Sequence, residues 1–387
     1  MSAIKVGVIG IGNMGSIYVK MLDKGQIQGA ELAAVCSRND SRIEWVKANT
    51  SGDVKIFKDQ DSFFESSGID AVLIVTPHYS HPDLAKKAFA AGIHVLVEKP
   101  AGVFTKNVLE MNEAAKASGK VFSIMYNQRA NPLYQKIREL VHTGELGKVK
   151  RTNWIITDSY RPQSYYDSGT WRATWKGEGG GALLNQVLHQ LDIWQWTTGL
   201  MPKAIRAVCG EGKYHDIEVE DDVTAFVEYE NGATGVIIAS TGEAPGTNRY
   251  EIVGDMGKIV AENDRLIFYK LAQSEREFNA SFKGGFGFPE YEEFVIPVAS
   301  DNGNHAFIIQ NWIDAIVKGT PLLAPGEEGL YALDITNAIY LSSWLNEPVS
   351  LPVDPDLYFE TLQKKINSST FEKKNVTSQT LDVKGTY

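Results

Sequence analysis

A glycine-rich turn between an apolar strand and a helix is the feature that most constrains this fold. Residues 4–9, Ile-Lys-Val-Gly-Val-Ile, form a short run rich in β-branched side chains, which predicts a buried strand. Residues 10–15, Gly-Ile-Gly-Asn-Met-Gly, follow at once, and residues 16–24 have the pattern of a helix. Strand, glycine turn and helix in this order are typical of a βαβ nucleotide-binding unit.

Each glycine of this turn has a distinct predicted role. Gly10 permits the tight turn, Gly12 lets the backbone approach a pyrophosphate, and Gly15 lets the helix pack closely on the strand. The free N–H groups of the helix N-terminus, with Asn13 and Met14, would then face the phosphates. The alternative is a tight turn without a ligand, and the setting favours the nucleotide site.

The tip of the second strand bears on the choice of dinucleotide. Residues 31–36 are predicted to form that strand, and Ser37 and Arg38 follow it where an enzyme that prefers NAD usually has Asp or Glu. A hydroxyl and a guanidinium suit the 2′-phosphate of NADP better, because arginine binds phosphate in a bidentate fork. Asp40 lies near enough to leave NAD open, and Arg38 could instead be a solvated charge. The prediction is NADP or NAD, with NADP favoured.

Strands and helices continue to alternate through the first third of the chain. Strands are predicted at residues 70–75, 93–97 and 121–125, and helices at 82–91 and 106–118. This order predicts an α/β domain over residues 1–126, a Rossmann doubly wound parallel sheet with its ligands at the carboxyl ends of the strands. Glu98-Lys99-Pro100 lies at such an end, so Lys99 is a candidate for contact with substrate; the alternative is a solvated lysine leaving a strand.

The remaining chain predicts an α+β domain over residues 127–364 with a large, mostly antiparallel, open-faced sheet. Strands are expected at 148–158, 223–229, 233–241, 250–254 and 257–262, separated by turn signals such as Glu-Asn-Gly at 230–232. Helices are expected at 133–143, 305–318 and 326–346. Residues 365–387 are polar and rich in Ser, Thr and Lys, which predicts an extended or disordered tail.

A block from Gly179 to Asp192 is the most informative part of this second domain. Three glycines are expected to open an apolar helix on which Asn185, His189 and Asp192 share one face. Histidine exchanges a proton near neutral pH, so His189 is a candidate general base; the alternative is a core histidine satisfied by Asp192. Upstream, Trp171-Arg172 could clamp a cofactor or simply lie at a domain interface.

Composition excludes several classes of partner. The 387 residues carry 38 basic and 48 acidic side chains, a net charge of −10, which disfavours nucleic acid and anionic membrane surfaces. The 2 cysteines, Cys36 and Cys209, allow no disulfide framework and lack metal-ligand spacing, so no metal is expected. The first residues have neither signal-peptide nor transit-peptide character and no apolar run approaches membrane length, so we expect a cytoplasmic protein.

Taken together, these motifs resemble the Gfo/Idh/MocA family of oxidoreductases, named for glucose–fructose oxidoreductase and inositol dehydrogenase. The resemblance runs from Gly10 to about Pro352. It is carried by the glycine motif of residues 10–15, Thr76-Pro77 with His81 following, Glu98-Lys99-Pro100, and the glycine block ending in His189 and Asp192.

This resemblance implies the fold predicted above and the positions of several ligands. Lys99 and His189 would face a nicotinamide and a sugar or cyclitol, and the open sheet would form the interface of a homodimer or homotetramer. The resemblance also implies cofactor contacts at Thr76, Pro77, His81, Glu98, Trp171 and Arg172, and a substrate mouth at Asn127, Gln128 and Arg129.

One departure concerns Asn185. The family usually has Asp at this position, whose charge would stabilise a protonated His189, whereas an amide can orient a ring without supplying charge. Asp192, one turn further on, could supply that charge instead. Tyr160 and Arg161 could bind sugar hydroxyls or serve only in loop packing.

The resulting hypothesis is an NAD(P)-dependent dehydrogenase acting on a secondary hydroxyl of a sugar, glycoside or cyclitol. His189 would take the hydroxyl proton, Asn185 would help to orient it, and Lys99 would stabilise the developing negative charge. Two alternatives stay open. One is a glycoside hydrolase that uses tightly bound NAD transiently, and the other is a non-catalytic regulator that binds dinucleotide and sugar.

Overall fold

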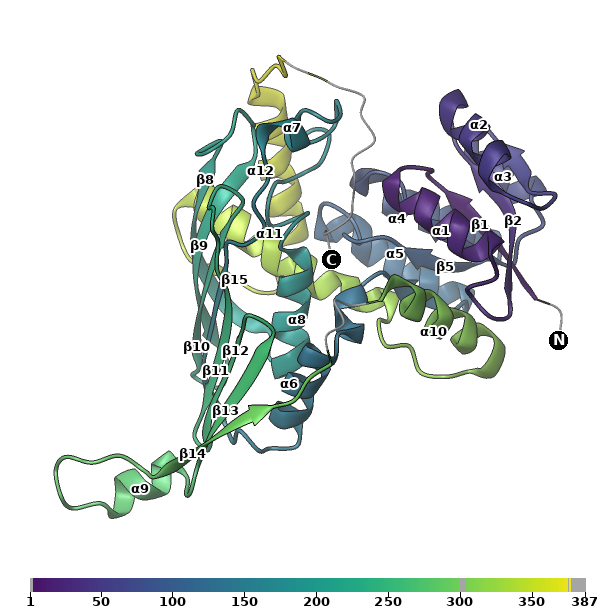
Figure 1. Cartoon of the computed structure of the whole chain (residues 1–387). Helices are drawn as coiled ribbons and strands as arrows, with labels where there is room; N and C mark the ends of the chain where they lie inside the picture. Colours follow the sequence, from purple (N-terminus) through teal and green to yellow (C-terminus); the bar gives the residue numbers. More distant parts are fainter. Residues whose placement is uncertain (1–2, 300–303, 375, 377–387) are drawn as a thin grey trace.

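Two sheets, each with its own helices, form the body of the molecule (Figure 1). The structure is a computed structural model and describes residues 3–299, 304–374 and 376. The first sheet is parallel and has the strand order β3-β2-β1-β4-β5-β6. Its strands are β1 (Ile4–Ile9), β2 (Ala30–Cys36), β3 (Lys55–Phe57), β4 (Ala71–Ile74), β5 (His94–Val97) and β6 (Phe122–Ile124).

Helices on both faces of this sheet complete the predicted Rossmann domain. They are α1 (Asn13–Asp23), α2 (Asp40–Asn49), α3 (Gln60–Ser66), α4 (His81–Ala90) and α5 (Thr105–Ser118), with the 3₁₀ turn η1 (His78–Ser80) before α4. The predicted strands and helices agree to within one residue at nearly every end. Helix α1 begins earlier than predicted because Gly12 is its N-cap. Elements α2, β3 and α3 were not predicted, since they are short and α2 buries only Ile43 and Val46.

The second sheet has nine strands in the order β14-β13-β12-β11-β7-β10-β9-β8-β15. Strands β7 and β10 pair in parallel, and every other neighbouring pair is antiparallel. The strands are β7 (Val149–Ile156), β8 (Pro202–Glu211), β9 (Glu220–Tyr229), β10 (Thr234–Ser240), β11 (Asn248–Gly254), β12 (Gly257–Glu262), β13 (Arg265–Leu271), β14 (Tyr291–Ile296) and β15 (Val349–Ser350). The mostly antiparallel sheet is confirmed, although β8 and β13–β15 were not predicted.

Within the part of the chain that the structure describes, helices cover one face of the large sheet, as Figure 1 shows. These helices are α6 (Pro132–His142), α8 (Leu188–Thr198), α11 (Gly329–Leu345) and α12 (Pro355–Ser368). Strands β8 and β9 alternate buried and exposed side chains, which places Val208 and Phe226 on the open face. Beyond β13, helix α9 (Glu275–Ser281) and its loop project away from the body (Figure 1).

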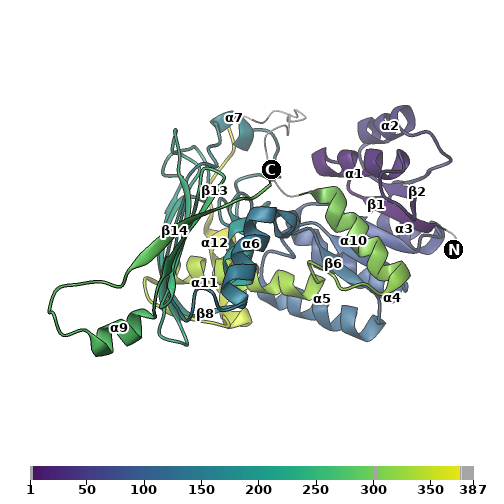
Figure 2. The same ribbon diagram turned by 60° about the horizontal axis from the view of Figure 1, so that its bottom comes forward.

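Helix α10 (His305–Lys318) returns the chain to the first domain (Figure 2). The side chain of Gln310 exchanges two hydrogen bonds with the backbone of Gln28, of 2.7 and 3.1 Å. The 3₁₀ turn η3 (Gly326–Glu328) follows, and Pro325 forms an isolated bridge with Ser123. This helix was predicted within the second domain, and its packing now ties the two domains together beside the pocket described below.

Two local predictions were wrong. The glycine block does not open a helix: the chain turns repeatedly until α8 begins at Leu188, so Asn185 does not lie on a helix face with His189 and Asp192. Three glycines in a row favour this compact turn over a helix, because glycine has no Cβ and its backbone loses much conformational freedom in a helix.

The predicted tail also begins too early. Helix α12 continues to Ser368, and residues 369–374 pack against the second domain. The ammonium of Lys373 donates to the carbonyl oxygens of Tyr166 and Gly169 at 2.6 Å each and of Arg172 at 3.1 Å. A charged lysine that satisfies three carbonyl groups fixes this segment, which composition alone cannot indicate. The predicted disorder of residues 375 and 377–387 lies outside the described residues.

Across the described ranges, no helix combines the length and apolar character needed to cross a membrane.

Candidate active site

A pocket of about 500 Å³ opens at the carboxyl ends of β1, β2, β4 and β5. Gly10 has φ +96°, a conformation that favours glycine, and a Cβ on Gly15 would lie 2.0 Å from the carbonyl oxygen of Gly10. A Cβ on Gly12 would meet nothing within 4 Å, so the backbone there faces open space at the N-terminus of α1. This geometry fits a dinucleotide, whose pyrophosphate would approach the Gly12 backbone and the free N–H groups of α1.

Residues from both domains line this pocket. Twelve of them were predicted: Gly10, Gly12, Asn13, Met14, Ser37, Thr76, Pro77, Glu98, Lys99, Trp171, Arg172 and Asn185. Trp171, Arg172 and Asn185 approach from the second domain. The pocket further includes Tyr165, together with Asn39, Arg42 and His78, which sequence reasoning missed.

Arg42, and not Arg38, borders the pocket beyond β2. Arg38 is exposed, whereas Arg42 lies in the first turn of α2 and lines the pocket beside Ser37. Asp40, which left the choice of cofactor open, pairs with Lys58 at 2.5 Å. The missed signal was the start of a helix: Asn39 is the N-cap of α2, and Arg42 is the third residue of that helix.

His81 contacts the backbone just beyond the ends of β4 and β5. Its ring nitrogens lie 2.7 Å from the carbonyl oxygen of Pro100 and 2.6 Å from that of Thr76. The imidazole is fully buried, so its contacts link the segments after β4 and β5. The structure therefore places His81 behind the pocket, where it positions Thr76 and Pro100.

Glu98 is a buried carboxylate at the same strand end. It accepts hydrogen bonds from the Tyr18 hydroxyl and, at 3.0 Å, from the backbone N–H of Lys99. Burial raises the pKa of Glu98, while the Tyr18 hydrogen bond and the Lys99 charge act in the opposite direction. Glu98 thus places a negative charge directly beside Lys99.

Lys99 reaches across to the second domain. Its ammonium donates to the backbone carbonyl of Asn185 at 2.9 Å and to the Asn185 side-chain oxygen at 3.2 Å. Burial lowers the pKa of Lys99, and the nearby carboxylates Glu98 and Glu178 oppose this effect. The structure brings together the two predicted residues Lys99 and Asn185 from segments 86 residues apart.

His189 lies in the first turn of α8, close enough to Lys99 to be affected by its charge. Burial, then the charges of Lys99 and His305, lower the pKa of His189 well below 6.5. His189 is therefore neutral near pH 7, the form that a general base requires. His305, at the start of α10, was not predicted; burial and Lys99 lower its pKa to about 4.

The carboxylate of Asp192 pairs with Arg129 and not with His189. Both its carboxylate oxygens accept from the Arg129 guanidinium, at 2.8 and 2.6 Å. Arg129 is 0% exposed, also pairs with Glu328, and is held between the rings of Tyr126 and Trp196. The conjecture that Asp192 supplies charge to His189 is wrong, because this bidentate buried pair already occupies the carboxylate.

The predicted substrate mouth at residues 127–129 is likewise largely buried. Asn127 is 0% exposed and Gln128 5% exposed, in the 3₁₀ turn η2 (Asn127–Ala130). Of the three, Gln128 borders a pocket. Arg129 lines neither pocket, and its guanidinium donates to Asp192, Glu328 and the carbonyl oxygen of Leu323, so we assign it a structural role.

Trp171 and Arg172 are held by a cluster of side chains around Tyr165. The Tyr165 hydroxyl accepts from Arg172 at 2.8 Å, from Gln186 at 3.0 Å and from Asn185 at 3.3 Å. The Arg172 guanidinium lies 4.6 Å from the centres of both the Trp171 and Tyr165 rings. These contacts join the loop that carries Trp171 to the turn that carries Asn185.

The glycine block is fixed by a buried carboxylate from β9. Glu220 accepts from the backbone N–H groups of Gly181 at 2.9 Å and Leu183 at 2.8 Å, and from the Tyr340 hydroxyl at 2.8 Å. A Cβ on Gly181 would lie 2.1 Å from the Glu220 carbonyl oxygen. The close approach of two backbones therefore requires this glycine, and it sets the position of Asn185 downstream.

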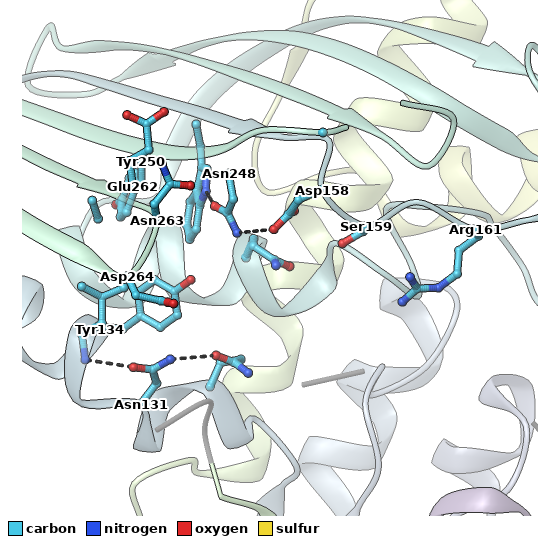
Figure 3. Close-up of a pocket in the computed structure, with 16 residues that line it drawn as sticks. Asn131, Tyr134, Asp158, Ser159, Arg161, Asn248, Tyr250, Glu262, Asn263 and Asp264 are labelled. Atoms are coloured by element: carbon cyan, nitrogen blue, oxygen red, sulfur yellow. Dashed lines mark hydrogen bonds between the residues drawn. The ribbon is translucent and has the colours of Figure 1, made fainter. Parts of the chain in front are cut away.

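A second pocket, of about 430 Å³, lies between η2, α6 and the sheet (Figure 3). Amides, carboxylates and aromatic rings line it: Gln128, Asn131, Tyr134, Trp154, Asp158, Ser159, Arg161, Gln190, Asn248, Tyr250, Glu262, Asn263 and Asp264. Arg161 lies at one end in Figure 3 and its charge lowers the pKa of Lys99, so this end is near Lys99. Tyr160 is 47% exposed and does not line either pocket.

The polar groups of this pocket are only partly satisfied by one another. The Asn248 amide donates to Asp158 at 3.1 Å and accepts from Trp154 at 2.9 Å. The Nε atom of Arg161 is buried and has no hydrogen-bond partner among the described residues. A guanidinium donor and a carboxylate facing the same cavity suit a ligand rich in hydroxyl groups, which both donate and accept.

Comparisons with known proteins agree with this geometry. Residues 4–126 match the model of the oxidoreductase family with an NAD-binding Rossmann fold, and residues 134–260 match the GFO/IDH/MocA C-terminal domain. Inositol 2-dehydrogenase of Rhizobium meliloti is 23% identical over 339 residues, covering 87% of this chain and 95% of that protein. Myo-inositol 2-dehydrogenase of Thermotoga maritima is 26% identical over 336 residues, covering 85% and 93%.

A solved structure shows the same fold. The WlbA dehydrogenase from Bordetella pertussis, in complex with NADH and UDP-GlcNAcA, superposes with a TM-score of 0.77 at 23% identity. The match covers 91% of this chain and 100% of that one.

Proposed function

The chain belongs to the Gfo/Idh/MocA family of oxidoreductases, and from that premise we propose that it reversibly oxidises a secondary hydroxyl of a sugar, glycoside or cyclitol. The observation that carries the proposal is the contact between Lys99 and Asn185 in the first pocket, with His189 close enough for the Lys99 charge to lower its pKa. The inositol dehydrogenases among its relatives support the chemical class of the substrate.

In this proposal each polar group of the site has one task. His189, neutral because it is buried, takes the proton of the substrate hydroxyl. The Lys99 ammonium has three donors and gives two hydrogen bonds to Asn185, which leaves one for the substrate oxygen. That bond stabilises the negative charge that develops as the proton leaves. The nicotinamide, when bound, accepts the hydride.

The second pocket supports a polyhydroxyl substrate. Its walls combine side-chain amides and carboxylates with Tyr134 and with Trp154 and Tyr250, which stack at 4.0 Å between ring centres. Such walls can hydrogen-bond several hydroxyl groups and pack against the apolar face of a ring. We assign Arg161 and Asp158 to substrate and leave Tyr160 and Arg129 outside this assignment.

The cofactor is NAD or NADP, and we favour NADP. No carboxylate follows β2 at a position facing the pocket: Ser37 and Arg42 line it, and Asp40 is engaged by Lys58. A hydroxyl and a guanidinium are suited to a 2′-phosphate.

We further propose a homodimer or homotetramer formed through the C-terminal sheet. The helix-free face of that sheet and the projecting segment after β13 support this assembly, since Phe286 and Phe288 are 99% and 77% exposed. Exposed aromatic side chains of this size are typical of protein interfaces. Sedimentation analysis of the purified protein tests the assembly directly, and a monomer at micromolar concentration would contradict it.

A direct assay tests the activity. The purified protein is mixed with NAD⁺ or NADP⁺ and a panel of sugars, cyclitols and glycosides, and the absorbance of the reduced cofactor is followed. We expect a substrate-dependent rise. Release of an aglycone without net reduction would instead indicate a hydrolase that uses NAD transiently. Binding of sugar that alters cofactor affinity, without either reaction, would indicate a regulator.

A further inference from the structure

The amide of Asn185 joins two charged groups. Its side-chain oxygen accepts from the Lys99 ammonium at 3.2 Å, while its side-chain nitrogen donates to a carboxylate oxygen of Glu178. An ionised carboxylate only accepts hydrogen bonds and an ammonium only donates them, so the amide nitrogen of Asn185 faces Glu178 and its oxygen faces Lys99. Lys99, Asn185 and Glu178 thus form a continuous chain from a cation through a dipole to an anion.

Glu178 is held rigidly in this place. The side chain is 3% exposed, and its second carboxylate oxygen accepts from the backbone N–H of Ala173 at 2.6 Å. Its backbone carbonyl oxygen lies 3.1 Å from the ring nitrogen Nδ1 of His78. The glycines on either side are required, since a Cβ on Gly177 would lie 2.3 Å from the carbonyl oxygen of Trp171 and one on Gly179 would lie 2.3 Å from the Val103 side chain.

Burial raises the pKa of Glu178, and the charge of Arg172 opposes this effect more strongly than the charge of Lys99 does. The nearest cationic partner of Glu178 is Arg172, at 3.9 Å, and that guanidinium already donates to Tyr165. Asp192, the other acidic residue of the block, is committed to Arg129. Of the two acidic residues Glu178 and Asp192, Glu178 is therefore the one joined to Lys99 through Asn185.

We propose that Glu178 is a positioning residue that supplies, through the amide of Asn185, the negative charge that an aspartate at position 185 would supply directly. This inference rests on the proposed function of Lys99. Glu178 fixes the amide so that its oxygen faces Lys99, and it stabilises the ammonium form that donates to the substrate oxygen. Asn185 and Glu178 then act together on the ammonium of Lys99.

Several other charges act on Lys99 and change its pKa. Glu98 stabilises the ammonium as Glu178 does, whereas Arg161 and Arg172 disfavour it. His78, His189 and His305 also lie within electrostatic reach of Lys99, and burial lowers the pKa of each, so they are neutral near pH 7. Removing the Glu178 charge would leave two arginines opposed by one carboxylate.

The test measures the ionisation of Lys99 itself, so it does not depend on finding a substrate. The full-length protein is labelled with trace acetic anhydride across a pH series, and acetylation of Lys99 is quantified by peptide mass spectrometry. In Glu178→Gln we expect the apparent pKa of Lys99 to fall by about one pH unit, a tenfold change in its ionisation constant. In Glu178→Gln/Asn185→Asp, which moves the charge to position 185, we expect the pKa to return towards its original value.

Glu218→Gln is the matched control. Glu218 accepts from the backbone N–H of Trp175 at 2.9 Å, in the same irregular segment, but it does not act on Lys99. Its replacement should leave the Lys99 titration unchanged. An unchanged titration in Glu178→Gln, or a fall that the relocated carboxylate does not reverse, would overturn the proposal. If the titrations behave as expected but no substrate is oxidised, the proposed dehydrogenase activity fails and the placement of charge stands.

Discussion

The two walls of the dinucleotide pocket are built in different ways. The wall from the first domain consists of residues that directly follow β1, β2, β4 and β5, so a hydrogen-bonded parallel sheet fixes their positions. The wall from the second domain comes from residues 157–187, which contain only one short helix, α7 (Gln163–Tyr166), among their regular elements. Hydrogen bonds of buried and partly buried polar side chains hold that segment: Glu178, Glu220, Tyr165 and Lys373.

The first wall is therefore held in place by the backbone hydrogen bonds of a sheet, and the second by hydrogen bonds of side chains. On the first wall, a substitution outside the pocket changes stability before it changes the site, because the sheet holds each strand end. On the second wall, a single buried polar contact far along the chain can move a ligand-binding residue. Substitutions on each wall test this contrast.

The largest effect is expected where the two walls meet, at Lys99 and its partner base. Lys99→Ala should lower kcat by about 10³-fold, because it removes a charged donor to the substrate oxygen. His189→Asn should lower kcat by about 10²–10⁴-fold through loss of the general base. Affinity for NAD(P)H, measured by fluorescence titration, should change little in either. Lys106→Ala, an exposed lysine paired with Asp356, is the control. Undiminished turnover in Lys99→Ala would refute the proposed role of Lys99.

The pH dependence of kcat/KM should have two limbs. Acidification through the pKa of His189 adds the proton that a base must lack, and because burial lowers that pKa, the acid limb should lie below pH 6.5. Raising the pH through the pKa of Lys99 removes the donor, and because burial lowers this pKa too, the alkaline limb should begin below pH 10.5. His189→Asn should abolish the acid limb. An acid limb above pH 6.5 would assign it to another group.

The same contrast explains how much the sequence could predict. The glycine turn and the strand ends of the first wall were predicted, since strand, glycine turn and helix are adjacent along the chain, whereas Asn39, Arg42 and His78 were missed. The roles of Lys99, Asn185 and His189 at one site stay a prediction that came from the family resemblance. What failed depended on contacts distant in sequence: Asp192 paired with Arg129, 63 residues away, and Lys373 bonded to carbonyl groups about 200 residues away. Local patterns carry no information on such pairs.

Substitution of Lys373 tests how the second wall is held in position. Its three hydrogen bonds to carbonyl oxygens hold the segment that presents Trp171 and Arg172 to the pocket. Lys373→Met should therefore raise the Kd for NAD(P)H by about tenfold, since hydrogen bonds to a charged group are lost. Lys374→Met, which removes an exposed neighbour with a 3.5 Å contact to Asp216, should leave the Kd unchanged.

A double-variant experiment shows whether Lys373 acts through this segment. In a Trp171→Ala background, Lys373→Met should cause little further loss of cofactor affinity, although both backgrounds should lose thermal stability alike. Equal losses of affinity in the two backgrounds would show that Lys373 acts by a route other than the position of Trp171.

The smallest effect is expected on the first wall, at the tip of β2. Arg42→Ala should raise the Kd for NADP⁺ about tenfold more than the Kd for NAD⁺, because Arg42 lines the pocket and a guanidinium pairs with a 2′-phosphate. Arg38→Ala should change neither, since that side chain is exposed and outside the pocket lining. If Arg38→Ala and not Arg42→Ala weakens NADP⁺, the residue at the strand tip is the phosphate ligand. Arg42→Ala should also leave kcat unchanged, because the strands of the first sheet fix the position of Lys99 independently of Arg42.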